Sequence, residues 1–157
     1  MPTKEGFGRY LEDFRVGELI EHWPGRTITE ADDVLFCMLT MNHHPLHSDA
    51  KYAADTQFGQ RIVAGPLVYS LVFGMTVPVV SGKAIANLAT SEMRHLAPVF
   101  HGDTLYARTE VLAVRDSKSQ PDRGIVTVKT EGVNQKGAVV LEFQRAVMLP
   151  KRAAAAE

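Results

Sequence analysis

Cysteine is almost absent from this chain of 157 residues, which has a single one at position 37. A disulfide within the chain is therefore excluded, and one free thiol agrees with a reducing compartment. Long apolar runs are missing as well. The longest, residues 65–80, is shorter than a bilayer crossing requires and is broken by two prolines, a glycine and two hydroxyl residues. Residues 1–8 contain no apolar run of signal-peptide length. These absences predict a cytoplasmic protein.

No block of one charge is present either. The 17 lysines and arginines are scattered among 18 acids, and the formal net charge is −1. A basic surface for nucleic acid is therefore not expected. A G-x-S-x-G element is also missing, so a serine hydrolase has no support in the sequence.

The composition, with 45% hydrophobic and 22% charged residues, is that of a globular protein. The length is sufficient for one domain and too short for two ordinary ones. We expect a single domain over residues 1–150 and a disordered, alanine-rich tail over residues 151–157.

Helical patterns occupy the first half of the chain. Thr29 begins one as an N-cap followed by acids and apolar residues, and we expect it to end near Asn42, ahead of Pro45. Residues 49–54 form a short helical turn. Residues 67–77 are apolar on nearly every side, which indicates a helix buried all round.

Alternation and β-branched residues dominate after Gly82. Residues 84–88 and 91–96 form either one strand or two. Three long strands are expected at 104–115, 124–134 and 138–149, with a hairpin turn at residues 134–137. One buried helix and long antiparallel strands predict an α+β fold in which the sheet wraps around the helix. Because such strands leave an edge to be covered, we expect a homodimer or a higher homo-oligomer.

The region from Thr40 to Gly65 holds the chemistry-bearing residues. Its three histidines, His43, His44 and His47, follow the end of the first helix. Imidazole titrates near neutral pH, so these rings suit proton transfer, although a solvated turn is the simpler interpretation. Adjacent histidines rarely converge on one ion, and no metal site is expected.

Two segments of this region resemble the MaoC-like hydratases and dehydratases. They read N-x-x-P-L-H-x-D-x-x-Y-A from Asn42 and F-G-x-R-I-V-A-G from Phe58, and residues 10–17 and 98–105 are similar to the same family. The resemblance implies the hot-dog fold and a hydro-lyase that hydrates a 2-enoyl-CoA to a 3-hydroxyacyl-CoA, or catalyses the reverse dehydration, without a cofactor.

The family motif, D-x-N-P-L-H, implies a histidine and an aspartate that activate water. His47 matches the histidine, but Asn42 stands at the aspartate position and His44 at the asparagine position. An amide cannot act as a base near neutral pH. Three hypotheses follow. In the first, His47 is the only base and Asn42 orients the water; in the second, Asp49 supplies the missing carboxylate; in the third, the protein binds acyl-CoA without converting it. We favour the first.

The resemblance also implies that the backbone N–H of Gly65 binds the thioester oxygen, at the start of the buried helix. The family often has a histidine directly before this glycine, where this chain has Ala64.

Several charged or polar residues are candidates for substrate binding. Lys118 and Arg123, in the loop between two predicted strands, are candidates for the CoA phosphates. Arg94 is a candidate for a carboxylate on the acyl group, which would indicate a dicarboxylic thioester of the mesaconyl or itaconyl type. His44 and Asp49 are further candidates. His22, His95 and His101 are interpreted as structural or surface residues.

Three functions remain open at this stage. The first is the hydratase, the second an acyl-CoA thioesterase of the same fold, and the third a non-catalytic acyl-CoA-binding subunit. Fold alone does not separate them, because function depends on the site.

Overall fold

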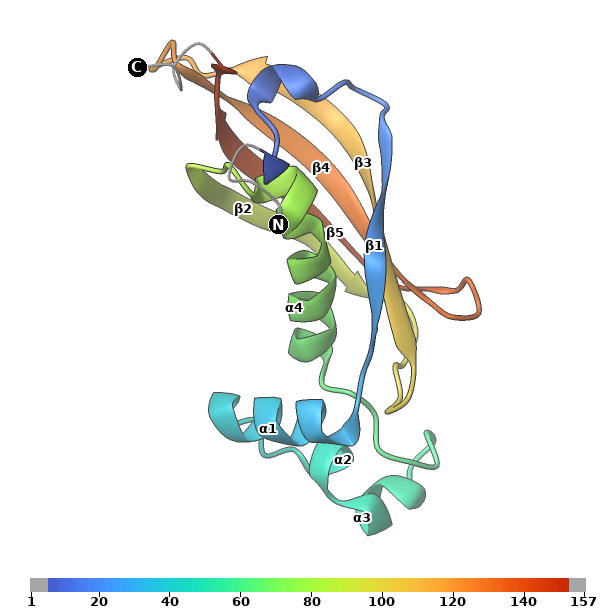
Figure 1. The fold of residues 1–157 in the computed structure, drawn as a ribbon. Coiled ribbons are helices and arrows are strands. Elements are labelled where there is room, and N and C mark those ends of the chain that lie inside the picture. The colour runs from blue at the N-terminus through green and yellow to red at the C-terminus, as the bar shows by residue number, and fades with distance from the viewer. Residues whose placement is uncertain (1–5, 153–157) are drawn as a thin grey trace.

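A computed structural model of the chain describes residues 6–152. Its centre is helix α4 (Gly65–Thr76), which continues into a π-helical turn, η3 (Val77–Ser81), and lies against the inner face of a curved sheet (Figure 1). Close packing of the helix depends on Gly132, since a Cβ there would lie 2.7 Å from a methyl carbon of Val72. The buried helix expected at residues 67–77 is confirmed, with a start two residues earlier.

The sheet has five antiparallel strands in the order β1-β3-β4-β5-β2. Their bounds are β1 (Leu19–Thr27), β2 (Ala86–His95), β3 (Thr104–Asp116), β4 (Arg123–Asn134) and β5 (Val139–Pro150). Buried and partly exposed residues alternate along β4 and β5, as expected for strands with one face on a core. The three long predicted strands are confirmed, and so is the α+β arrangement.

Two strands add to the prediction from sequence. The region expected to form either one strand or two forms one strand, β2, with register shifts after Asn87 and Ser91. β1 was not expected, because Pro24 and Gly25 interrupt its pattern. In the part of the chain that the structure describes, β1 pairs only with β3 and is therefore an edge strand. Proline is tolerated there because one side of the backbone needs no ladder partner.

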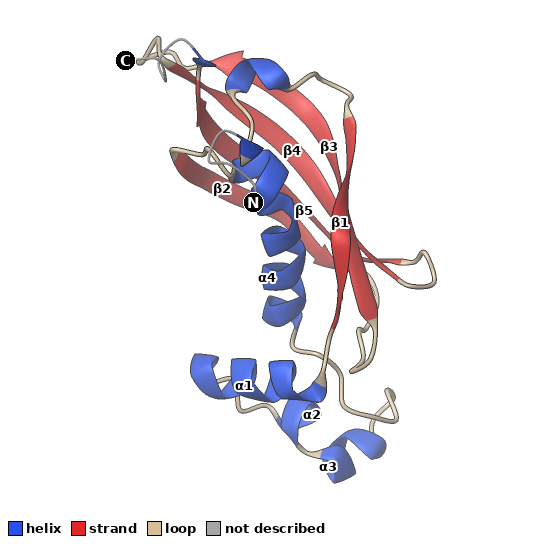
Figure 2. Cartoon of the chain, in the orientation of Figure 1, coloured by secondary structure: helices blue, strands red, loops and turns tan. Residues whose placement is uncertain are grey.

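Three short helices, α1 (Glu30–Thr40), α2 (Pro45–Ser48) and α3 (Ala50–Ala54), lie beyond the end of the sheet near the start of α4 (Figures 1 and 2). The predicted N-cap of α1 is confirmed, since Thr29 Oγ1 accepts from Asp32 N–H at 3.2 Å and Asp32 Oδ2 accepts from Thr29 N–H at 2.8 Å. The helix ends earlier than expected, at Thr40, because Met41 adopts the left-handed conformation with φ 58°. Pro45 opens α2, where its missing N–H costs nothing.

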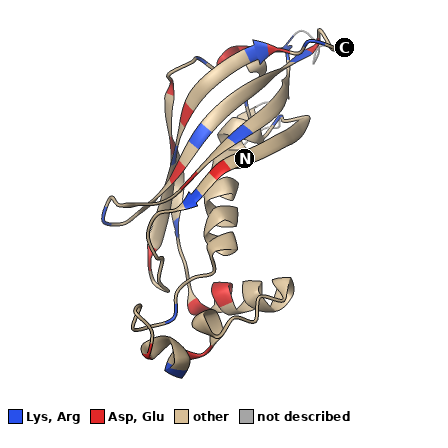
Figure 3. Cartoon of the chain, turned by 180° about the vertical axis from the view of Figure 1, so that it is seen from behind, with Lys and Arg blue, Asp and Glu red and all other residues tan. Residues whose placement is uncertain are grey.

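The outer face of the sheet carries charges of both signs in mixed order (Figure 3). Arg108 and Lys129 pair with Glu131 at 2.7 and 3.2 Å, and Lys129 also reaches Glu142 at 2.9 Å. Among residues 6–152, no helix is both long and apolar enough to cross a bilayer. Residues 153–157 of the predicted tail lie outside the described residues, while Lys151 donates its backbone N–H to Asp122 O at 2.8 Å.

A row of polar side chains crosses the inner face beside α4. His22 Nε2 lies 2.9 Å from Thr109 Oγ1, and Thr109 Oγ1 lies 2.9 Å from Thr130 Oγ1. Further along the same face, the Arg145 guanidinium donates to Thr76 Oγ1 at 2.7 Å. Burial, together with the nearby Arg145 and Arg9 charges, lowers the pKa of His22 to about 4.

We expect His22 to make the fold sensitive to mild acid. Its ring stays neutral in the folded protein until about pH 4, whereas in the unfolded chain it takes up a proton below about pH 6.5. Stability is therefore lost as the pH falls through this window, by up to about 3 kcal/mol for this group alone. His22→Phe should remove that part of the loss, which urea unfolding at pH 7 and pH 4.5 would measure. Equal losses in both proteins would contradict the assignment, and above pH 7 their difference should be constant.

Candidate functional site

The candidate site lies at the N-terminal end of α4, where α2, the segment before α4 and the end of β2 meet. The first of its residues is His47, on α2, which is half-buried. Its Nδ1 lies 2.8 Å from the carbonyl oxygen of Ile62. A carbonyl can only accept, so Nδ1 carries the hydrogen and Nε2 of the neutral ring has a free lone pair. The backbone thus sets the tautomer that a general base at Nε2 requires.

Asn42 lies between α1 and α2 and is half-buried. Its backbone N–H donates to Cys37 O at 2.9 Å. Within residues 6–152 its side-chain amide makes no hydrogen bond, so the amide is available to a water molecule or a ligand.

His44 and Asp49 serve as helix caps. His44 Nδ1 accepts the N–H of Leu46 at 3.1 Å at the start of α2. Asp49 Oδ1 accepts the N–H of Tyr52 at 3.0 Å at the start of α3. A short polar side chain such as asparagine usually accepts this backbone N–H at an N-cap. The same bond explains why a hydrogen-bond acceptor suits this position of the motif.

Gly65 has a backbone N–H without a protein acceptor within residues 6–152. The next residue, Pro66, has no N–H, and those of Leu67 and Val68 both donate to Ala64 O, at 2.9 and 3.2 Å. Gly65 therefore supplies the free donor of the first turn of α4, where the helix dipole favours negative charge. This geometry suits an oxygen on which charge develops.

Asp33 is a residue of this region that the sequence interpretation missed. It is fully buried in α1, accepts the Ala64 N–H at 2.9 Å with Oδ1, and accepts from His101 Nε2 at 2.8 Å with Oδ2. The two side chains hold the residue before Gly65 in place. A signal was present, because Asp33 is four residues before the buried Cys37 and so lies on the apolar face of α1.

Cys37 is not a candidate nucleophile. Its thiol is buried and faces the Asp33 carboxylate, with Sγ 3.8 Å from Oδ1. Burial and the charge of Asp33 raise the pKa of the Cys37 thiol, which keeps it protonated and unreactive at neutral pH.

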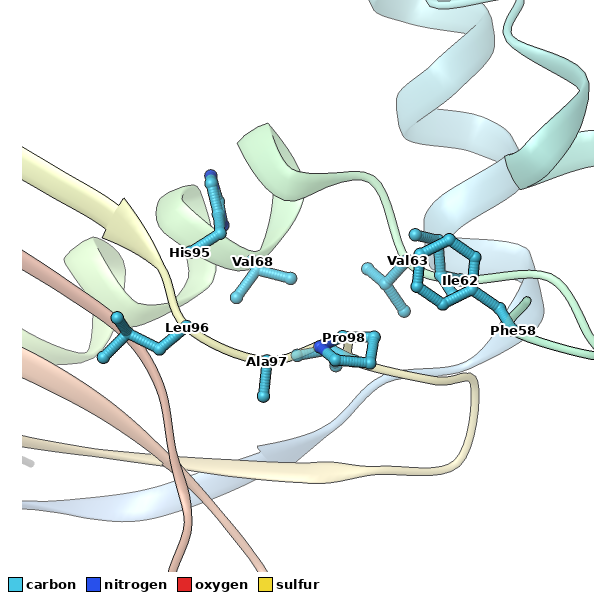
Figure 4. A pocket seen from close by; sticks show the side chains of 9 residues that line it. Phe58, Ile62, Val63, Val68, His95, Leu96, Ala97 and Pro98 are labelled. Carbon is cyan, nitrogen blue, oxygen red and sulfur yellow. The ribbon is translucent and has the colours of Figure 1, made fainter. Parts of the chain in front are cut away.

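A pocket of about 310 Å³ adjoins the start of α4 (Figure 4). Ile62, whose carbonyl binds His47, contributes to its wall. His95 provides the one polar side chain, and the remaining lining residues are apolar: Phe58, Val63, Val68, Leu96, Ala97, Pro98 and Val99. His95 also lies against Gly65, since a Cβ on Gly65 would come within 2.9 Å of His95 Cε1.

The three cations proposed for substrate binding lie elsewhere in the chain. Arg94 is on the outer face, 3.8 Å from both Glu92 and Glu142. Lys118 is in the loop after β3, and Arg123, at the start of β4, makes a two-point contact with Asp122 at 2.8 Å that helps to lower the pKa of that acid. The structure does not bring them to His47 within one chain. Within residues 6–152, no group of three or more metal-binding side chains is present.

Comparison with known proteins gives one family. Residues 13–134 match the model of the MaoC like domain. The chain is 40% identical over 153 residues to a protein named mesaconyl-CoA hydratase from Cereibacter sphaeroides, a match that covers 98% of this chain and 44% of that protein. The chain thus spans less than half the length of this relative.

Two further matches concern a shorter relative and the fold. The (R)-specific enoyl-CoA hydratase of Aeromonas caviae is 35% identical over 120 residues, which cover 76% of this chain and 85% of that protein. A conserved hypothetical protein of Mycobacterium tuberculosis with a double hotdog fold superposes with a TM-score of 0.83 at 26% identity, over 92% of this chain and 44% of that one.

Proposed function

The chain belongs to the MaoC-like family and has a hot-dog fold, and from this premise we propose that it hydrates a 2-enoyl-CoA thioester to a 3-hydroxyacyl-CoA, or catalyses the reverse dehydration. The observation that carries the proposal is the hydrogen bond from His47 Nδ1–H to Ile62 O, which leaves Nε2 free as a base. Gly65 supplies the complementary donor at the start of α4.

In the proposed reaction, His47 acts at the two carbons of the double bond and Gly65 acts at the thioester oxygen. His47 Nε2 takes a proton from water as the water oxygen bonds to C3 of the enoyl group. The C2=C3 π electrons move toward the thioester, whose oxygen gains charge and accepts from the Gly65 N–H. The proton held on His47 then passes to C2, which restores the carbonyl and the neutral imidazole. No cofactor or metal takes part.

Asn42 has a supporting role in this proposal. Its unpaired amide can hold the attacking water by a hydrogen bond but cannot remove its proton. Asp49 is less suited to supply a second carboxylate, because its side chain already caps α3. His47 is then the general base, and His44 orders α2 as its cap.

The acyl group proposed is short and is branched or dicarboxylic, as in mesaconyl-CoA. The pocket beside Gly65 is small and mostly apolar, with a volume of about 310 Å³. The mesaconyl-CoA hydratase relative, at 40% identity, supports this substrate class.

An assay on a panel of enoyl-CoA thioesters tests the proposal. The hydratase predicts loss of the enoyl-thioester absorbance without release of free thiol. Release of CoA would instead indicate a thioesterase. Thermal stabilisation by the thioester without either change would indicate an acyl-CoA-binding subunit.

We also propose a cytoplasmic homodimer or higher homo-oligomer. β2 is an edge strand whose residues are exposed along almost its whole length, including the apolar Leu88 and Met93. An exposed apolar edge strand is normally paired or covered in proteins that do not aggregate. A monomeric mass in light scattering at micromolar concentration would contradict this part.

A further inference from the structure

His95 occupies an unusual position at the end of β2. Its ring lies against Gly65, with Cε1 at 2.9 Å and Nε2 at 3.0 Å from where a Cβ on Gly65 would be. The lack of a side chain on Gly65 thus makes room for this imidazole. His95 is exposed in the single chain, and within residues 6–152 neither of its ring nitrogens has a hydrogen-bond partner.

The pocket gives this ring a second property. Eight of the nine side chains that line it are apolar, and His95 is the exception (Figure 4). In apolar pockets, a small number of polar groups orient the ligand and determine which one is accepted. An unpaired imidazole N–H at the rim of this pocket is a donor for a polar substituent on the acyl group.

We propose that His95 is the specificity-determining residue for a dicarboxylic enoyl thioester and donates a hydrogen bond to the carboxylate at the far end of the acyl group. The inference rests on the proposed hydratase function and on Gly65 as the donor to the thioester oxygen. The neighbouring Arg94, by contrast, points to Glu92 and Glu142 on the outer face.

The covalent geometry of the substrate agrees with this placement. In a trans-2-enedioyl thioester, three bonds separate the thioester carbonyl carbon from the carboxylate carbon, and three bonds in a trans arrangement span about 3.8 Å, as between consecutive Cα atoms. With the thioester oxygen on the Gly65 N–H, an acyl chain that runs toward β2 therefore brings its carboxylate within reach of the ring that packs against the same glycine. A hydrogen bond there involves an ionised acceptor and is stronger than one between neutral groups.

The test uses two substrates that differ only in the carboxylate. One is mesaconyl-CoA with its thioester on the methyl-bearing side, and the other is (E)-2-methylcrotonyl-CoA, in which a methyl group replaces the carboxylate. His95→Phe should lower kcat/KM for mesaconyl-CoA by about 10- to 100-fold, mainly through KM, and leave (E)-2-methylcrotonyl-CoA unaffected. His95→Gln, which keeps an N–H donor, should retain part of the preference.

Four results would overturn the inference and leave the hydratase standing. They are equal losses on both substrates, which would place His95 at the thioester end; no loss on either; a wild-type preference for the methyl substrate; and loss of the preference in Arg94→Gln instead. If the wild-type protein hydrates no enoyl-CoA at all, the proposed function fails, and this inference fails with it.

Discussion

Replacing His47 with alanine should reduce kcat for enoyl-CoA hydration by about 10²- to 10⁴-fold, the usual contribution of a general base. The reason is the hydrogen bond between Nδ1–H and Ile62 O, which presents Nε2 as the group that takes the proton from water. Asn42 offers no substitute, since its amide has no basic atom near neutral pH. Stopped assays with each purified variant at saturating thioester would measure the change.

His43 provides a matched control. It lies in the same loop, is exposed, and its side chain makes no hydrogen bond within residues 6–152. His43→Ala should keep wild-type turnover, while Asn42→Ala should weaken turnover less than His47→Ala because only water orientation is lost. Full activity in His47→Ala would rule out the proposed base, provided that circular dichroism shows an intact fold.

Gly65→Ala should lower kcat by about 10²- to 10³-fold, comparable to the loss of an oxyanion donor. The N–H itself is kept, but the new methyl group would come within 2.9 Å of His95 Cε1 and 3.0 Å of Nε2. A Cβ contact of 2.9 Å is too short, so the exposed His95 ring must swing aside, and the methyl group then fills the space beside the donor. We expect the methyl group to keep the thioester oxygen from reaching the Gly65 N–H at hydrogen-bond distance.

Gly74→Ala, in the same helix, is the control for this change. Within residues 6–152, a Cβ on Gly74 would meet no atom within 4 Å apart from the adjoining backbone of its own helix. We expect this variant to keep its turnover and to gain about 0.5–1 kcal/mol of stability, because alanine favours the helix. If Gly65→Ala and Gly74→Ala had the same activity, the N-terminus of α4 would not bind the reacting oxygen.

Local patterns predicted most of the architecture. The N-cap at Thr29, the apolar run of α4 and the alternation in β3 to β5 each depend on neighbouring residues, so each can be read directly from the sequence. β1 escaped prediction because the proline and glycine in it usually end a strand. They are tolerated here only because β1 is at the edge of the sheet, which the sequence does not state.

The site was less accessible to prediction, since it depends on contacts between distant residues. The Asp33 and His101 side chains meet across 68 positions, and no periodic pattern marks such a pair. His95 and Arg94 are adjacent in sequence, yet one ring lies against Gly65 and the other side chain reaches Glu142 on the outer face. Neighbouring residues of a strand point to opposite faces, so the side chain that lies on the inner face is identified only once the sheet is known.

The hydrogen bond from the Ala64 N–H to Asp33 makes the site depend on the folding of distant segments. The donor at Gly65 is aligned by a carboxylate from α1, which is itself held by His101 from the turn before β3. None of these segments is close to another along the chain. A chain in which only the hairpin between β4 and β5 has formed therefore lacks this alignment, and the donor is held in place only once α1, the start of α4 and the turn before β3 have come together.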